Sequence, residues 1–327
     1  MRRRAWFVGG ALALALLCAA VCAWLFWPRN GESPAQIEFL IGMSQANLTE
    51  PWRITMNQDI ERKASRHDNL RVIFTNASQE IQRQDNERHQ DDIRRQIQDI
   101  RRLMGYGIDL LVVSPIDGEA LMPVISEVFS QIPVIVLDRG VRGEEYTLFI
   151  GPNNYMIGQL AGAEVARLLG EGGGRVLEIQ GVHGSPPVAE RSKGFADALA
   201  GKRDVVPAAQ LVGNWMQDQA EDRTKEYMVE HPGKIDVVFA QNDAMAYGAR
   251  LAIDKLRVPG VRYVGVDGLD GPGGGREMVQ KGLLDATFSC PTGGEQAIEY
   301  ALRILKGEPA LPRALILDPI RIAGSAQ

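Results

Sequence analysis

The chain has 327 residues, of which 45% are apolar and 24% charged, and this composition is that of a globular protein with enough apolar residues for two cores. Its 36 Lys and Arg against 41 Asp and Glu give a formal net charge of −5. Nucleic-acid binding needs clustered basic residues, and this acidic chain has no long basic run. The composition therefore argues against DNA or RNA as a partner.

The first thirty residues predict export. Three arginines at positions 2–4 precede an uncharged apolar stretch over residues 5–27, which is long enough to cross a bilayer as a helix. Basic residues favour the cytoplasmic side, so we expect residues 1–29 to form a signal anchor and 30–35 a linker. A cleaved signal peptide, cut after Ala23, is the alternative. Either way, we expect the remainder in the periplasm or on the outer face of the cytoplasmic membrane.

The cysteines and histidines predict neither a metal site nor a cofactor. Cys18 and Cys22 lie in the apolar stretch, and Cys290 is alone in the rest of the chain, so no disulfide is expected within the body. The four histidines are scattered, and no metalloprotease, nucleophile-elbow or Walker motif occurs. The sequence therefore does not support an enzyme.

From residue 36 onward, short apolar runs alternate with helix-length amphipathic segments, which predicts βα units and parallel sheets. After the first strand, Pro51 suits a first helical turn, and Trp52, Met56 and Ile60 then share one face. The charged segment 79–104 predicts a solvated helix. The expected strands are 37–43, 70–76, 110–114, 134–137, 148–151, 176–180, 210–213, 237–240, 262–266, 286–289 and 315–317. So many strands favour two doubly wound α/β lobes over one sheet.

Polar side chains follow several of these strands. In doubly wound sheets, ligands bind beyond the carboxyl ends of the strands. Carboxylate, guanidinium and amide groups meeting there can hydrogen-bond a ring of hydroxyl groups, and Trp52 could cover the apolar face of a sugar. Asp243 has an alternative role, because an acidic residue after a strand can cap the next helix. The strand-end candidates are Gln45, Ser114, Asp138, Arg139, Asn242 and Asp267, with Arg191 near a helix start.

Four segments resemble the type I periplasmic sugar-binding proteins, the receptors for ribose, galactose and related sugars. They are Val-Val-Ser-Pro-Ile-Asp-Gly (112–118), Ile-Pro-Val-Ile-Val-Leu-Asp-Arg (132–139), Phe-Ala-Gln-Asn-Asp-Ala-Met-Ala (239–246) and Val-Gly-Val-Asp-Gly (264–268). The resemblance covers residues 36–322. The segment 44–53 is similar to the branch that recognises galactofuranose-type sugars.

The resemblance implies two lobes joined by three crossings, near Gly151, Cys290 and Pro309. The first lobe is then expected to contain residues 36–150 and 291–309, and the second lobe residues 151–290 and 310–327. A ligand that contacts both lobes would favour their closure.

Carried over residue by residue, the resemblance gives a ligand site from both lobes. The first lobe is expected to contribute Gln45, Trp52, Arg53, Ser114, Asp138 and Arg139, and the second Arg191, Trp215, Asn242 and Asp267, with Cys290 at the hinge. Two positions depart from the family. Cys290 stands where these receptors usually have a polar amide. Gln219 occupies the place of the usual second-lobe aromatic residue, unless Trp215 substitutes for it.

The resemblance implies a monomeric binding protein that closes on a monosaccharide or polyol and delivers it to an ABC importer. An alternative is a membrane-anchored sensory protein that reports sugar occupancy to a transmembrane histidine kinase or chemoreceptor. A sugar-responsive repressor of the same fold is disfavoured, because a membrane segment stands where such a protein has its DNA-binding helices.

Overall fold

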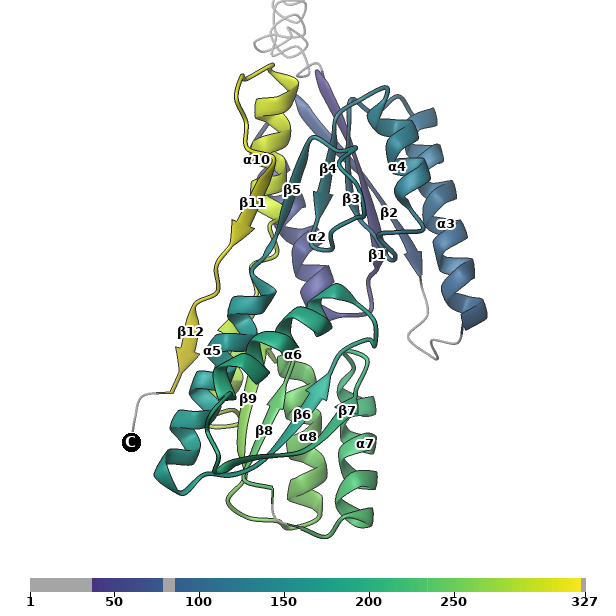
Figure 1. The fold of residues 1–327 in the computed structure, drawn as a ribbon. Helices are drawn as coiled ribbons and strands as arrows, with labels where there is room; N and C mark the ends of the chain where they lie inside the picture. Colours follow the sequence, from purple (N-terminus) through teal and green to yellow (C-terminus); the bar gives the residue numbers. More distant parts are fainter. Residues whose placement is uncertain (1–36, 79–85, 234, 325–327) are drawn as a thin grey trace, which may run out of the picture. The chain divides into compact units, whose positions relative to one another are not determined.

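The computed structural model describes residues 37–78, 86–233 and 235–324. Within these ranges the protein is an α/β fold with two six-stranded sheets, each packed with helices, as the alternating pattern predicts (Figure 1). The expected membrane segment 5–27 and linker 30–35 lie outside these ranges. No helix in the described part of the chain is long and apolar enough to cross a membrane.

The first lobe is built on a sheet with the strand order β11-β5-β4-β3-β1-β2, in which the neighbouring strands are parallel. Its helices connect successive strands, except α10, which packs against α2. The strands are β1 (Phe39–Asn47), β2 (Leu70–Ser78), β3 (Leu110–Ser114), β4 (Val134–Leu137), β5 (Leu148–Pro152) and β11 (Ala314–Leu317). The helices are α2 (Pro51–Ala64), α3 (Asn86–Gly105), α4 (Met122–Phe129) and α10 (Gly294–Leu305).

The second lobe repeats this architecture with the order β12-β10-β9-β8-β6-β7. Five of its strands are parallel, and only the edge strand β12 is antiparallel to its neighbour. The strands are β6 (Gly174–Gln180), β7 (Val205–Val212), β8 (Val237–Ala240), β9 (Arg262–Asp267), β10 (Ala286–Ser289) and β12 (Arg321–Ala323). The helices are α5 (Asn154–Leu169), a short 3₁₀ turn (Gly170–Gly172), α6 (Pro186–Leu199), α7 (Gln217–Glu230), α8 (Asp243–Lys255) and α9 (Gly275–Gln280).

Three crossings connect the lobes, and the third differs from the prediction. The chain crosses after β5, between β10 and α10, and between β11 and β12. The sequence analysis put the third crossing near Pro309 and residues 310–327 in the second lobe. That placement is wrong for Ala314–Leu317, because this strand pairs with β5 and its apolar side chains pack on the first core. The return to the second sheet occurs over residues 318–320.

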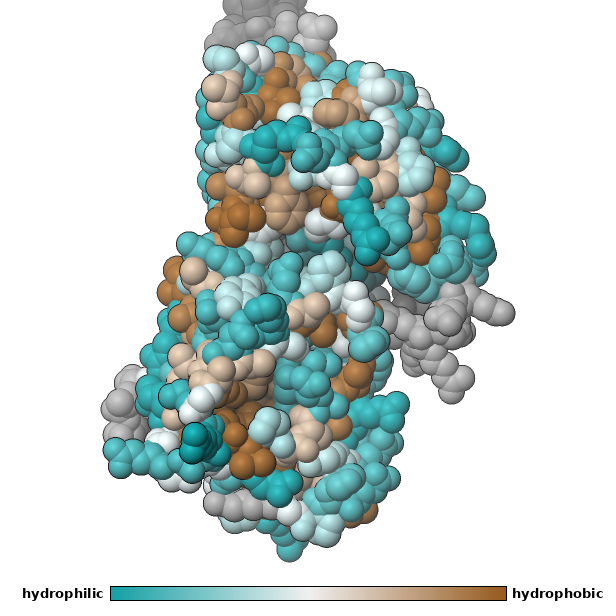
Figure 2. Space-filling model, viewed as in Figure 1, coloured by the Kyte–Doolittle hydropathy of each residue, from teal (hydrophilic) through white to brown (hydrophobic). Residues whose placement is uncertain are grey.

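The burial of the inner strands explains why the sequence predicts them. The strands β3, β4 and β8 are completely buried, as expected for parallel strands covered by helices on both faces. By contrast, Figure 2 shows a visible surface that is mostly hydrophilic, with separate apolar patches. The apolar cores therefore hold the sheets together. The carboxyl ends of the strands lie outside these cores and can carry polar side chains.

Candidate functional site

A small pocket, called here the inner pocket, is lined by both lobes where the carboxyl ends of their strands meet. In this structure it has a volume of about 30 Å³. That is the share of one water molecule in the liquid. The lining residues are Trp52, Arg53, Asp138, Arg139, Pro187, Arg191, Trp215, Asn242, Asp267 and Cys290.

A larger hollow, called here the outer cleft, adjoins the inner pocket. Its volume is about 1000 Å³, and it shares Asp138, Arg139 and Pro187 with the inner pocket. Polar groups of both lobes line it, including Glu50 and His89 of the first lobe and His183 and Glu190 of the second. A small molecule entering from the outer cleft therefore meets the shared residues before the rest of the inner pocket.

Arg53 organises the first-lobe wall of the pocket. Its guanidinium is buried, and Nη1 donates to Gln45 Oε1 at 2.7 Å and to Ser114 Oγ at 3.0 Å. Nη2 pairs with Asp138 Oδ2 at 3.1 Å, and Nε lies 3.5 Å from Glu50 Oε1. Gln45 and Ser114 are register partners near the ends of the neighbouring strands β1 and β3, which explains how two residues 69 positions apart in the chain present acceptors to one arginine. These two residues support Arg53 from behind and do not line the pocket.

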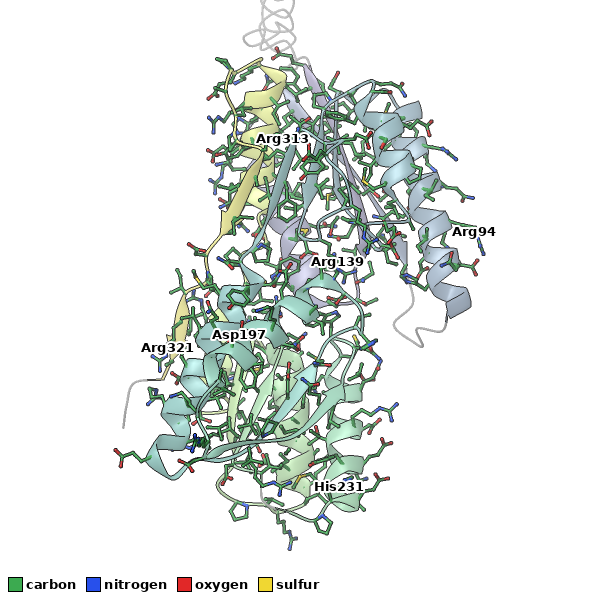
Figure 3. All side chains as sticks on the ribbon, in the orientation of Figure 1. Arg94, Arg139, Asp197, His231, Arg313 and Arg321 are labelled. Atoms are coloured by element: carbon green, nitrogen blue, oxygen red, sulfur yellow. The ribbon has the colours of Figure 1, made fainter. Side chains whose placement is uncertain are left out.

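Asp138 and Arg139 follow β4 in a turn that directs both side chains toward the pocket. Asp138 has a φ of 71°, a left-handed conformation that Asp tolerates better than most residues. Arg139, labelled in Figure 3, donates from Nη1 to the Ile116 carbonyl at 3.3 Å, and its Nε lies 3.9 Å from Asp138. Burial and the nearby Arg53 charge lower the pKa of the Arg139 guanidinium. Arg139 Nε has no hydrogen-bond partner within the described ranges, so this group retains donor capacity for a ligand.

Arg191 and Cys290 join the second-lobe wall to the hinge. Arg191 lies on α6, and its guanidinium donates to Asn154 Oδ1 at 2.9 Å, to the Gln241 carbonyl, and to Cys290 Sγ at 3.1 Å. The Cys290 carbonyl accepts from Trp52 Nε1 at 2.6 Å. Burial raises the pKa of the Cys290 thiol to about 12, so the thiol is neutral at physiological pH. Cys290 thus contacts residues of both lobes.

Trp215, not Gln219, provides the second-lobe aromatic surface. Its indole lies 5.5 Å from the Arg191 guanidinium, and its Nε1 is buried without a hydrogen-bond partner in the described part of the chain. Gly181 makes this position possible, because a Cβ there would overlap the indole ring at 2.1 Å. Gln219 accepts a hydrogen bond from Asn214 and lines the outer cleft. Trp215 therefore lines the inner pocket, whereas Gln219 does not.

Asn242 and Asp267 end β8 and β9 in the second lobe. Asn242 caps α8 by accepting from Met245 N at 2.8 Å, and it donates to the Trp215 carbonyl at 3.0 Å. Asp267 has a φ of 112°, and its carboxyl has no hydrogen-bond partner among the described residues. Burial, and next the charge of Asp243, raise the pKa of Asp267 well above the ordinary value. The Asn242 side chain is therefore already engaged in hydrogen bonds within the second lobe, whereas the Asp267 carboxyl is available to a ligand.

The structure brings together most of the predicted site. Nine of the eleven predicted ligand-binding residues line the inner pocket, and the other two, Gln45 and Ser114, contact Arg53. The sequence analysis missed Pro187, Glu50 and Asn154. The Ser-Pro-Pro turn before Arg191 was a signal for Pro187. Glu50 and Asn154 line the outer cleft and contact Arg53 and Arg191, and no pattern in the sequence marked either contact.

Comparison with known proteins shows to which family this chain belongs. Residues 41–309 match the family described as "Periplasmic binding protein domain". The ribose import binding protein RbsB of Bacillus subtilis (strain 168) is 28% identical over 305 residues, which cover 91% of this chain and 92% of that protein.

Two solved structures show the same fold. The fructose-binding periplasmic domain of a hybrid two-component system has a TM-score of 0.78 and 32% identity, covering 87% of this chain and 90% of that one. A Mycobacterium smegmatis protein in complex with β-D-fucofuranose has a TM-score of 0.77 and 25% identity, covering 87% and 91%.

Proposed function

The chain belongs to the type I periplasmic sugar-binding protein family, and from this premise we propose that it binds a monosaccharide or polyol in the inner pocket and delivers it to an ABC importer. One observation carries the proposal. Side chains from both lobes and the hinge line a single pocket that combines two indoles, three arginines and two aspartates. Arginine and carboxylate groups form strong hydrogen bonds with hydroxyl groups, and the indoles suit the C–H faces of a sugar.

The size of the pocket requires movement for sugar entry. A volume of about 30 Å³ is smaller than any monosaccharide, whereas the outer cleft of about 1000 Å³ is larger. We infer that the lobes separate at the three crossings, admit the sugar from the outer cleft, and close around it. Because the ligand would contact both lobes, it would stabilise the closed arrangement.

We infer that the pocket binds its ligand, because its one thiol is unsuited to nucleophilic attack. Within the described ranges, no group of His, Cys, Asp and Glu side chains could hold a metal ion. The Cys290 thiol is buried and neutral, and it accepts a hydrogen bond from Arg191 instead of lying beside a general base. A nucleophilic cysteine needs a lowered pKa, so this one is unsuited to attack.

The proposal is tested by thermal unfolding of the purified full chain against D-fructose, D-ribose, L-arabinose, D-galactose, xylitol and myo-inositol. A ligand at 100 times its Kd stabilises a protein by about 2.7 kcal/mol, which raises the unfolding midpoint by several degrees. A shift with one sugar and not with the others supports the proposal. No shift with any of them at millimolar concentration contradicts it.

A sensory role is the second candidate, favoured by the similarity to the fructose-binding domain of a two-component system. In that role, residues 5–27 stay as a membrane anchor, and the monomeric binding domain reports its occupancy to a kinase or chemoreceptor. Sequencing the N-terminus of the protein extracted from membranes distinguishes the two. An intact N-terminus favours the anchored sensor, and a mature form starting near Trp24 favours release into the periplasm.

A further inference from the structure

Gln96 is a buried glutamine on the charged helix α3, and it lines neither the inner pocket nor the outer cleft. Its side chain is fully buried and lies on the same face of the helix as Ile93 and Ile100. An amide at a core position costs free energy unless hydrogen bonds satisfy it. The partners of Gln96 therefore show what this helix requires that an apolar side chain could not supply.

The Gln96 side chain holds the turn that follows β3. Its Oε1 accepts from the Ile116 amide at 2.9 Å, and its Nε2 donates to the Ser114 carbonyl at 3.0 Å. Pro115, between these two residues, has no N–H to donate, so Ile116 carries the first backbone donor after the strand. One side-chain amide thus satisfies the acceptor before Pro115 and the donor after it.

This turn carries acceptors for two arginines of the inner pocket. Ser114 Oγ accepts from Arg53 Nη1 at 3.0 Å, and the Ile116 carbonyl accepts from Arg139 Nη1 at 3.3 Å. Both arginines line the inner pocket, and they are 1% and 9% exposed. An arginine side chain has many rotamers, so the direction of its guanidinium depends on such acceptors. A shift of the turn would therefore move both guanidinium groups relative to a ligand.

The same amide also reaches β1. Gln96 Nε2 donates to Ser44 Oγ at 3.3 Å, and the next residue, Gln45, accepts from Arg53 Nη1 at 2.7 Å through its Oε1. Gln45 is the register partner of Ser114. Gln96 therefore holds the neighbouring strands β1 and β3 against one helix, at the level where both present acceptors to Arg53.

We propose that Gln96 is a positioning residue of the sugar site, which directs Arg53 and Arg139 by fixing the acceptors of both. This inference rests on the proposed function, because it concerns how the same pocket holds its ligand. Gln96 acts through the turn of residues 114–116 and does not itself touch the ligand. The site then determines the residue type, because an amide side chain has both the donor and the acceptor that this turn requires.

The first test compares the Kd of the purified full chain with that of Gln96→Met, by calorimetry with the six probes of the thermal-unfolding test. Methionine is flexible and close to glutamine in size, so the change removes the hydrogen bonds and leaves little cavity. We expect the Kd of the variant to be about tenfold higher, which corresponds to one weakened hydrogen bond from a displaced guanidinium. An unchanged Kd in the folded variant would overturn the proposal.

A double-mutant cycle with Arg139→Lys separates positioning from a general loss of stability. If Gln96 acts through the guanidinium groups, Gln96→Met should raise the Kd by a factor about threefold smaller in the Arg139→Lys chain than in the natural chain. A purely structural role does not depend on Arg139, so it would raise the Kd by the same factor in both chains. Equal factors would therefore overturn the proposal.

The control on the same helix is Asp99→Asn. Asp99 is also buried and lies about one turn further along α3, where it pairs with Arg102 at 3.4 Å. Within the described ranges it makes no hydrogen bond to the turn of residues 114–116. This variant should keep the Kd of the natural chain within about twofold. A rise as large as that of Gln96→Met would show that any polar change in the buried face of α3 has the same effect, and this too would overturn the proposal.

Arginine side-chain NMR of the ligand-free chain tests the positioning without a sugar. A guanidinium held at Nη1 rotates slowly about its Cζ–Nε bond and gives separate Nη signals, whereas a free one gives an averaged signal. The natural chain should give separate signals for Arg53 and Arg139, assigned with their lysine variants, and Gln96→Met should average them. Arg191, held by Asn154 of the second lobe, should be the same in both chains.

The NMR result also decides the matter if Gln96→Met fails to fold, because averaged Arg139 signals in the natural chain would overturn the proposal. Failure of the proposed function is distinguishable from failure of this inference. If none of the six probes binds the natural chain, the proposed function fails, and the NMR comparison alone shows whether Gln96 holds the two arginines. If a probe binds the natural chain and Gln96→Met with the same Kd, only the role of Gln96 fails.

Discussion

Trp52 Nε1 donates to the Cys290 carbonyl at 2.6 Å, and this bond joins the first helix of one lobe to the hinge segment between the lobes. Both residues are buried, with Trp52 7% and Cys290 4% exposed. The amide of Cys290 donates to the Asp267 carbonyl at 3.1 Å, so the hinge backbone is held from both sides. The indole that we propose to cover the sugar is therefore placed by the hinge itself.

Trp52→Phe tests this bond, and Trp215→Phe is its matched control. Loss of the indole N–H leaves the buried Cys290 carbonyl unpaired, which should lower the free energy of unfolding by about 1–3 kcal/mol. Trp215 Nε1 has no partner among the described residues, so Trp215→Phe should destabilise the ligand-free chain less. Urea unfolding of both variants measures the difference. An equal loss in the two variants would contradict the role of the Trp52 bond.

Asp138→Asn tests the buried pair with Arg53. Asn tolerates the left-handed φ of 71°, so the change removes the charge without adding backbone strain. Among the described residues, Arg53 then keeps one nearby anion, Glu50 at 3.5 Å. Removing one partner of a buried pair costs about 3 kcal/mol. We expect a lower urea midpoint together with weaker sugar binding.

The control for Asp138→Asn is Glu308→Gln, which breaks the exposed Arg303–Glu308 pair at 2.6 Å. Exposed pairs contribute little, so its midpoint should stay at that of the natural chain. A midpoint for Asp138→Asn that is equally unchanged would mean that the buried pair does not stabilise the fold.

The alternation of apolar runs and amphipathic segments was sufficient to predict most of the strands. Each of the eleven predicted strands is a strand of the structure. The inner strands, such as β3, β4 and β8, are buried on both faces and are therefore continuous apolar runs. The missed strand, Arg321–Ala323, has three residues and lies at an edge, too short for a pattern. The sheet to which Ala314–Leu317 belongs was mispredicted, because its partner β5 lies more than 150 residues earlier in the chain.

The position of the site followed from the strand-end rule, but its internal contacts did not. Asp138, Asn242 and Asp267 could be placed at the site because each follows an apolar run. The Arg53–Asp138 pair spans 85 residues, and no local pattern signals it. Trp215 reaches the pocket through a left-handed backbone conformation with a φ of 66°. Such a conformation is usually predicted from glycine or asparagine, and position 215 has neither. The conformation of Trp215 depends on packing with residues far away in the chain, such as Gly181, which leaves room for the indole.

The Cys290 thiol should resist alkylation in the folded chain. A thiol with a pKa of about 12 is almost wholly protonated at pH 8, and only the thiolate reacts readily. We expect the peptide containing Cys290 to remain unmodified by iodoacetamide at pH 8 and to be labelled after denaturation in urea. Mass spectrometry of that peptide distinguishes it from Cys18 and Cys22. Rapid labelling of the folded chain would show that the thiol is more exposed or more acidic than this geometry allows.

Arg191→Lys tests whether the guanidinium fork is required for binding. Arg191 contacts three acceptors on three different segments, Asn154, Gln241 and Cys290, and a single ammonium group cannot reproduce that geometry. If the fork also donates to the sugar, its loss should weaken binding by about 100-fold, since a hydrogen bond to a charged group contributes about 1.5–3 kcal/mol.

Arg250→Lys separates this effect from a general loss of stability. Arg250 also donates to two backbone carbonyls, of Gly282 and Leu283, at 2.7 and 2.9 Å, and it lies 5.6 Å from the Tyr263 ring. It therefore resembles Arg191 in its contacts but lies outside the inner pocket. Both lysine variants should unfold at somewhat lower urea concentrations, whereas only Arg191→Lys should lose affinity in calorimetry. Equal affinities in the two variants would show that Arg191 supports the second lobe without contacting the sugar.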